Sequence, residues 1–390
     1  MVALVVLVFV SVEALSFIAL HVLETRYHLG YTPVVTASIS ASHRRMLEDL
    51  LAGNTTYVTH SPALGWTIKP SGSSPLYRAN SQGFRANRNY EPRPLASRLR
   101  IAAFGDSFTH GDDVGNADTW QEALARVNDR LEVLNFGVGG FGLDQAYLRY
   151  RQDGVAYQPH MILIGFTSEN ILRSLSVFRP FYVGGTSLPL SKPRFAIEDS
   201  RLTLIENPLK ELSQYRELLD APARVLPRLG THDHYFRVRY RAGPLDVLPS
   251  VRVFKIARFD ILHPHHVTMK NGYYVRDSEA FRVTALTFDA FVGDVTRDRS
   301  IPIIVLFPHS GDIVRHRKDA TRPYAPLLEY LREKGHRYLD LLDWFDEHGR
   351  DIPIHDLAPM HYTPLGNKLV ANAVWNYLVR ERLVDPTVLK

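Results

Sequence analysis

Short apolar runs that stop at glycine-containing or polar turns recur along most of the chain after residue 97. Such runs predict buried β-strands, and an unbroken run such as MILIGF suits a strand whose two faces are both covered. The strands predicted in this way lie at residues 101–104, 131–136, 161–166, 301–307 and 337–342.

Helical patterns separate these strands. Thr119 and Glu122 form a capping box ahead of a helix, and Thr363 with Pro364 predicts the start of the last helix. Further helices are expected at 143–150, 285–295 and 326–334. Strands that alternate with helices predict an α/β protein, with a mostly parallel central sheet covered by helices on both faces in three α/β/α layers.

The first 23 residues have a different pattern, because they are almost all apolar and long enough to cross a bilayer as a helix. Glu13 interrupts the run, and a charge there costs roughly 3 kcal/mol on insertion scales. We expect a single-pass transmembrane anchor. A cleaved signal peptide and a buried core helix are the alternatives.

The remaining chain divides into segments of different character. Residues 24–96 are rich in Gly, Pro and Ser near their end, and are interpreted as a stalk and lead-in to a catalytic domain at 97–380. Residues 171–282 lose the alternation and are rich in Pro, Arg and aromatic residues. We interpret them as an insertion near the site that selects the substrate.

Composition narrows the function. The 390-residue chain has a net charge of +5, but its basic residues are scattered, so nucleic acid is not expected as a partner. It has no cysteine, which excludes disulfides and thiolate chemistry. Histidines gather at 232–234 and 263–266 without a metal-binding pattern, so we expect no metal and no cofactor.

The candidate chemistry begins at Ser107, in the sequence IAAFGDSFTHG. A strand that ends in glycine and then presents a hydroxyl places that hydroxyl at the carboxyl edge of a sheet, where α/β proteins build their sites. Ser107 is the candidate nucleophile, and it requires a base within reach. His361, in the loop before the last helix, is the candidate base.

Together with the glycines after the second strand and Asn170, these blocks resemble the SGNH hydrolases, also called GDSL-type esterases and lipases. The resemblance covers most of residues 99–380 and implies a flavodoxin-like fold. It implies that the backbone N–H of Ser107, the N–H of Gly140 and the side chain of Asn170 form the oxyanion hole, with Gly139 as a close competitor of Gly140.

Two blocks depart from the family pattern. The family commonly has an aspartate three residues before the histidine, where this chain has Ala358; Asp356, five residues before His361, is the predicted orienting acid. Asp343, or no acid at all, is the alternative. The asparagine block also has a longer gap after Gly165 and no following aspartate.

The glycines after the second predicted strand also permit another interpretation. Gly137, Gly139 and Gly142 spell G-x-G-x-x-G between a strand and a helix, as in a dinucleotide-binding turn. An acidic residue about 20 residues further on is not clearly placed, so we favour the oxyanion loop.

The predicted function is a serine esterase that cleaves an ester or O-acyl group. A cell-envelope or secreted polysaccharide is the first candidate substrate, and a lipid is the other. An O-acyltransferase that moves an acyl group to a sugar hydroxyl, and an inactive membrane-anchored glycan-binding protein, are the alternatives. Arg26, Arg44 and Arg45 follow the apolar segment, which by the positive-inside rule would keep the domain cytoplasmic. Resemblance to anchored family members favours an extracytoplasmic domain instead. The segment N-x-x-GFR, here Asn80–Arg85, is similar to one that some anchored members carry, and a packed surface loop is the alternative.

Overall fold

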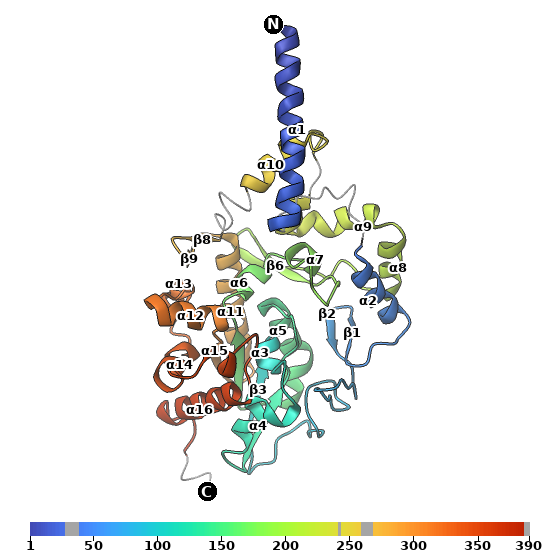
Figure 1. Cartoon of the computed structure of the whole chain (residues 1–390). Helices are drawn as coiled ribbons and strands as arrows, with labels where there is room; N and C mark the ends of the chain where they lie inside the picture. The colour runs from blue at the N-terminus through green and yellow to red at the C-terminus, as the bar shows by residue number, and fades with distance from the viewer. Residues whose placement is uncertain (28–38, 241–242, 259–267, 386–390) are drawn as a thin grey trace.

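The computed structural model describes residues 1–27, 39–240, 243–258 and 268–385. A five-stranded sheet, in the order β11-β10-β5-β3-β4, forms the centre of the body (Figure 1), and every neighbouring pair of strands is parallel. The strands are β3 (Leu99–Phe104), β4 (Leu131–Asn135), β5 (Met161–Phe166), β10 (Ile301–Leu306) and β11 (Tyr338–Asp340). The predicted fold class and strands are confirmed.

The strand order places a crevice at one edge of the sheet. In chain order the sheet reads second, first, third, fourth and fifth strand, which is the flavodoxin-like arrangement. The chain changes its direction of growth between β3 and β5, so the connections that leave these two strands run to opposite sides. Ligands of such sheets bind at this switch point, outside the carboxyl ends of the strands.

Helices cover both faces of the sheet. Helices α4, α14 and α16 pack together on one face, and α5 packs with α11 on the other. Thr119 and Thr363 accept hydrogen bonds from the backbone N–H groups of Glu122 and Gly366, as expected of N-caps. The helices of this part are α3 (Ser107–His110), α4 (Trp120–Ala125), α5 (Leu143–Arg149), α11 (Glu279–Arg297), α12 (Ser310–Asp319), α13 (Ala325–Glu333), α14 (Leu341–His348), α15 (Ile354–Leu357) and α16 (Pro364–Arg380).

The lead-in and the insertion build a second lobe with its own hydrophobic core. Trp66 and Tyr215 are fully buried in it, and Trp66 meets the ring of Phe141 from the main domain. The lead-in contributes α2 (Ala41–Leu51), β1 (Val58–Ser61) and β2 (Gly65–Ile68). The insertion contributes α7 (Arg179–Tyr182), α8 (Leu212–Asp220) and α9 (Pro222–Leu229) to this lobe. Its other elements α6 (Asn170–Arg173), β6 (Arg194–Glu198), β7 (Arg201–Ile205), β8 (Met269–Lys270) and β9 (Tyr273–Tyr274) pack against the core of the main domain, and α10 (Pro249–Ile256) belongs to neither core.

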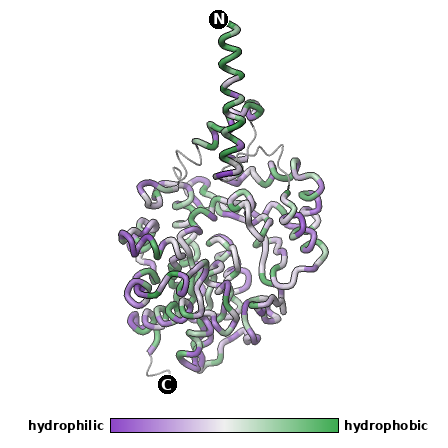
Figure 2. The backbone as a smooth tube through the Cα atoms, in the orientation of Figure 1, coloured by the Kyte–Doolittle hydropathy of each residue, from purple (hydrophilic) through white to green (hydrophobic). Residues whose placement is uncertain are grey.

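Helix α1 (Val2–Tyr27) projects from the body and is strongly apolar along its length (Figures 1 and 2). Its segment Val2–Leu23 has a mean hydropathy of 2.6, and none of its residues is fully buried. The alternative of a buried core helix is therefore wrong. Within the described part of the chain this is the single helix long and apolar enough to cross a membrane, a property that a signal sequence shares.

Candidate active site

Ser107 lies at the carboxyl end of β3, as the first residue of the short helix α3. Gly105 makes the turn possible, because a Cβ there would lie 2.1 Å from Oγ1 of Thr109. The Asp106 carboxylate caps α3 by accepting the N–H of Phe108 at 3.0 Å. Ser107 is nearly buried, with 6% of its surface exposed, so it sits in the floor of the crevice at the switch point.

His361 reaches the serine turn from the other end of the chain. Its ring packs on that of Phe108, the residue after Ser107, with a centroid distance of 5.1 Å. Its Nδ1 lies 2.8 Å from Oδ2 of Asp113. Among the described residues no partner takes Nε2, so this nitrogen is available to a hydroxyl or a leaving group.

Asp113, and not Asp356, contacts the imidazole of His361. A carboxylate on Nδ1 holds the proton there and leaves Nε2 as the base, which is what an orienting acid must do. Asp356 instead has its carboxylate 3.4 Å from His355, while its backbone oxygen accepts from Thr363. The structure does not bring Asp356 to the imidazole, because helix α15 directs its side chain toward solvent.

The other alternative acid is also placed elsewhere. Asp343 lies on the first turn of α14 and forms an ion pair with Arg322. Arg322 also binds Asp340, the N-cap of the same helix. Its carboxylate therefore serves a surface ion-pair cluster, and Asp113 alone among these candidates meets His361.

A buried arginine holds the loop that carries Asp113. Arg85 donates to the backbone oxygens of His110, at 2.8 Å, and of Gly111 and Val114. Asp113 itself has a φ of 69°, an unfavourable angle for a side-chain-bearing residue. Its N–H donates to the hydroxyl oxygen of Tyr77 at 2.9 Å. Arg85 and Tyr77, both from the lead-in, therefore fix the backbone on which the carboxylate stands.

A second histidine lies beneath this loop. Burial lowers the pKa of His110, which favours the neutral ring. The ring bridges Asp112, 2.5 Å from Nδ1, and the hydroxyl of Tyr57, 2.7 Å from Nε2. Burial also raises the pKa of Tyr57, so its hydroxyl stays protonated and donates to Nε2. His110 is therefore a satisfied structural histidine.

The glycine loop after β4 is held by its carbonyl oxygens. Trp66 Nε1 donates to Gly139 O at 3.0 Å, while Arg179 and Arg173 donate to Gly140 O and Phe141 O, each at 2.8 Å. Each donor comes from a different element of the second lobe or its border. Burial lowers the pKa of Arg179 to about 10, which leaves it charged at neutral pH.

These bonds also set the direction of the N–H groups. In a planar trans peptide the C=O of one residue and the N–H of the next point in opposite directions. With the oxygen of Gly139 turned to Trp66, the N–H of Gly140 points the other way, and no described residue accepts it. The φ of 79° at Gly140 lies in the left-handed region that favours glycine. The N–H of Ser107 likewise has no acceptor in the described part of the chain.

Asn170 is tied to the serine turn. Its Nδ2 donates to Oδ2 of Asp106 at 2.9 Å, and Thr167 donates to the same oxygen at 3.0 Å. One carboxamide hydrogen remains for another acceptor. Its role as an oxyanion donor stays a prediction.

The position of Asp144 after Gly142 argues against a phosphate-binding turn. Asp144 in the first turn of α5 accepts the N–H of Gln145 at 2.8 Å and forms a buried ion pair with Lys192. A carboxylate therefore already occupies the helix N-terminus, where a dinucleotide would place its pyrophosphate.

No metal centre is apparent in the described ranges, where no three His, Cys, Asp or Glu residues are grouped to hold an ion. His263, His265 and His266 lie outside the described residues.

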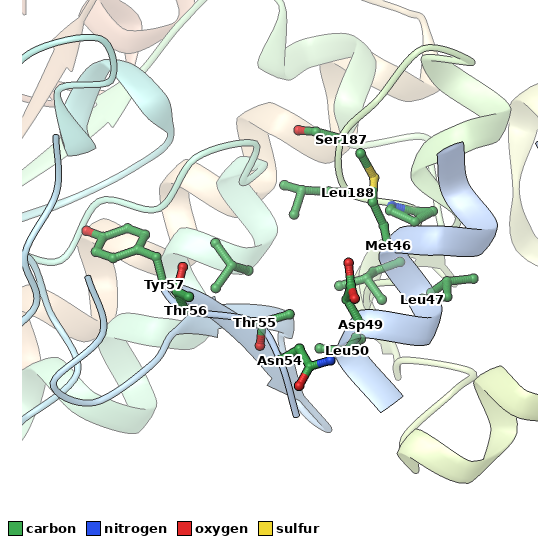
Figure 3. A pocket seen from close by; sticks show the side chains of 13 residues that line it. Met46, Leu47, Asp49, Leu50, Asn54, Thr55, Thr56, Tyr57, Ser187 and Leu188 are labelled. Atoms are coloured by element: carbon green, nitrogen blue, oxygen red, sulfur yellow. The ribbon is translucent and has the colours of Figure 1, made fainter. Parts of the chain in front are cut away.

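Two cavities border these residues. One of about 310 Å³ is lined by α2, residues 54–58 and residues 187–190 (Figure 3). Leu188, in its wall, also lies against Gly140. The other, of about 750 Å³, lies over the ends of β5 and β10 and is lined by polar groups that include Ser168, Asn271, His309 and Arg315.

Sequence reasoning missed Asp113, Arg85 and Trp66. The pair Asp112–Asp113 directly after the serine block and the GFR segment were visible signals. The role of Trp66 had no local signal, because its partner is 73 residues away.

Comparison with models of known protein families finds no match, and no curated protein matches. Several solved structures are similar at low identity. A member of the lipolytic protein G-D-S-L family from Veillonella parvula is 13% identical, with 72% of this chain and 99% of that chain covered and a TM-score of 0.37. A catalytic mutant of an acetylxylan esterase from Geobacillus stearothermophilus is 12% identical (73% and 95% covered, TM-score 0.38). A two-domain esterase active on acetylated mannans is 11% identical (73% and 49% covered, TM-score 0.36).

Proposed function

We propose that this protein is a serine esterase, in which Ser107 attacks the carbonyl carbon of an ester or O-acyl group. The observation that carries the proposal is the hydrogen bond from His361 to Asp113, which lie 248 residues apart, directly beside the serine turn. A histidine so oriented, next to a hydroxyl at the switch point of the sheet, matches what acyl transfer requires.

The steps follow from the positions of the groups. Nε2 of His361 removes the proton of Ser107 as its oxygen bonds to the carbonyl carbon, while Asp113 stabilises the imidazolium. The oxyanion that forms is held by the N–H groups of Ser107 and Gly140 and by the carboxamide of Asn170. His361 then gives its proton to the departing alcohol, leaving an acyl-enzyme. Water, deprotonated by the same nitrogen, releases the acid and restores the serine.

We propose a polysaccharide as the bearer of the acyl group. The cavity of about 750 Å³ is lined by Ser168, two residues before Asn170, and combines apolar surface with hydroxyl, amide and charged groups that suit a sugar ring and its hydroxyls. Tyr362, the residue after His361, donates its hydroxyl at 2.7 Å to the backbone oxygen of Pro308, which directly precedes His309 in the wall of this cavity. An acylated glycan crossing the carboxyl ends of β5 and β10 would present its ester to Ser107.

A fluorophosphonate probe tests the nucleophile. We expect the full chain in detergent to be labelled at Ser107, and Ser107→Ala to be unlabelled. The matched control is Ser168, which donates to Asp312 in the neighbouring cavity, and Ser168→Ala should still be labelled. Absence of labelling in folded protein would contradict the proposal.

The substrate class is tested by comparing the release of acetate from acetylated xylan or mannan with the hydrolysis of glycerol esters. Transfer of the acyl group to an added sugar would instead favour the acyltransferase.

A further inference from the structure

The apolar helix α1 has a charged residue in its middle, and that residue is bonded to a distant part of the chain. Ser250, on the first turn of α10, donates its N–H to one carboxylate oxygen of Glu13 at 3.0 Å and its hydroxyl to the other at 2.5 Å. The two residues are 237 positions apart. Glu13 thus caps the N-terminus of α10, a place that favours a negative charge.

The contact between the two helices is a continuous face. From Glu13 onwards one side of α1 is half-buried, whereas residues 2–12 are exposed all round. The positions on this side recur at helical spacing and include two small residues: Glu13, Ser16, Ala19, Leu20 and Leu23. Helix α10 packs on α1 (Figure 1). Small residues let helices approach closely where polar bonds must be made within lipid.

The segment that ends in α10 exposes several large apolar side chains while it buries a charged one. Leu245, Val247 and Phe254 are 60%, 77% and 63% exposed. Asp246, in contrast, is buried and forms an ion pair with Lys255 at 2.6 Å. In water the opposite arrangement is expected, and contiguous exposed apolar side chains mark a contact with a partner or a membrane.

The position along α1 identifies that partner. At 1.5 Å per residue, Val2–Leu23 is about 33 Å long, close to the hydrocarbon thickness of a bilayer of about 30 Å. Glu13 is ten residues before Leu23, or about 15 Å from the end of the span that is nearer the body. Since α10 begins beside Glu13, it lies at the depth of the lipid whenever α1 spans the membrane.

We propose that residues 243–256 enter the lipid bilayer together with α1 and form a second membrane-embedded element. Glu13 and Ser250 satisfy each other in this environment, as polar groups within membranes must. Arg252 and Lys255 are likewise satisfied within the segment, because Arg252 donates to the backbone oxygen of Asp246 at 2.6 Å and Lys255 pairs with its carboxylate. The proposal rests on α1 remaining in the membrane and is independent of the esterase chemistry.

The absence of cysteine in the chain gives a direct test. Single substitutions Val247→Cys and Phe254→Cys in the full chain, reconstituted in phosphatidylcholine vesicles, are labelled with a nitroxide. Leu95→Cys is the matched control, because Leu95 is a 62% exposed apolar residue of the body. We expect the labels at 247 and 254 to shift toward collision with oxygen over a water-soluble nickel chelate, and the label at 95 to show the reverse.

A second measurement tests the pairing of the helices. The double variant Glu13→Cys with Ser250→Cys should be linked by a short thiol-specific reagent in vesicles, and Glu13→Cys with Leu95→Cys should not. The proposal would be overturned if the labels at 247 and 254 collided with the nickel chelate as often as the label at 95. A mature chain from which α1 has been removed would also overturn it. Fluorophosphonate labelling of Ser107 on the same samples reports the esterase proposal separately.

Discussion

The carboxylate of Asp113 lies 2.8 Å from Nδ1 of His361, and both belong to loops that close over the carboxyl end of β3. This contact joins the serine block to the end of the chain. It makes the segment 107–113 the source of both the proposed nucleophile and the proposed orienting acid.

Exchange of Asp113 for asparagine tests this contact. An asparagine can donate to Nδ1, which would leave the proton on Nε2 and remove the base. We expect Asp113→Asn to lower kcat by roughly 10³- to 10⁴-fold. Asp356→Asn is the matched control and should retain activity, because its carboxylate is directed to His355. If ester hydrolysis were instead lost in Asp356→Asn and kept in Asp113→Asn, Asp356 would be the orienting acid.

Loss of the indole N–H of Trp66 tests the orientation of the glycine loop. Trp66→Phe keeps most of the buried ring but frees the oxygen of Gly139 to turn, and with it the N–H of Gly140. An oxyanion donor is worth about 10²- to 10³-fold in kcat, so a partly misdirected one should cost about tenfold, with KM little changed. Trp344→Phe is the control, since the Nε1 of Trp344 is buried without a partner. Equal effects of the two variants on kcat would argue against this role.

Arg85→Lys tests how the Asp113 loop is held. Lysine keeps the charge but lacks the planar guanidinium, so it cannot donate to the oxygens of His110, Gly111 and Val114 at the same time. We expect kcat to fall by about tenfold or more, because Asp113 leaves its strained backbone position. Double-variant kinetics supply the check: with Asp113→Asn already present, Arg85→Lys should have little further effect. Full additivity would show that Arg85 acts elsewhere.

The stability of the domain should depend on the ionisation of Asp340. Burial raises the pKa of Asp340 to about 6, although Arg322 lies 2.8 Å away. A folded-state pKa above that of the unfolded chain means that the folded state holds the proton more tightly. The stabilisation is therefore present at low pH and is lost as pH rises through about 6, by roughly 3 kcal/mol at most.

Melting temperatures measured across this range check the prediction. Asp340→Asn keeps an acceptor for the N–H of Leu342 at the start of α14 and should flatten the profile. Asp343→Asn, an exposed carboxylate on the same arginine, should leave the slope in place. A wild-type protein that becomes more stable from pH 4 to pH 7 relative to Asp340→Asn would contradict it.

The sequence by itself determined the sheet and the location of Ser107. Apolar runs such as MILIGF, bounded by turn residues, suit the middle of a parallel sheet, and a Gly-Asp-Ser turn after such a strand lies at the carboxyl edge of that sheet. It likewise determined the apolar helix at the start and the caps at Thr119 and Thr363, because these depend on residues within a few positions of one another.

Only the tertiary structure decided which carboxylate meets His361, what orients Gly140 and what Glu13 binds. Asp113, Trp66 and Ser250 are 248, 73 and 237 residues from the partners concerned. Spacing along the chain carries no information about such pairs, since the distance between them is set by how loops and lobes pack. Asp356 is near His361 in sequence, yet the helix that carries it turns its carboxylate away.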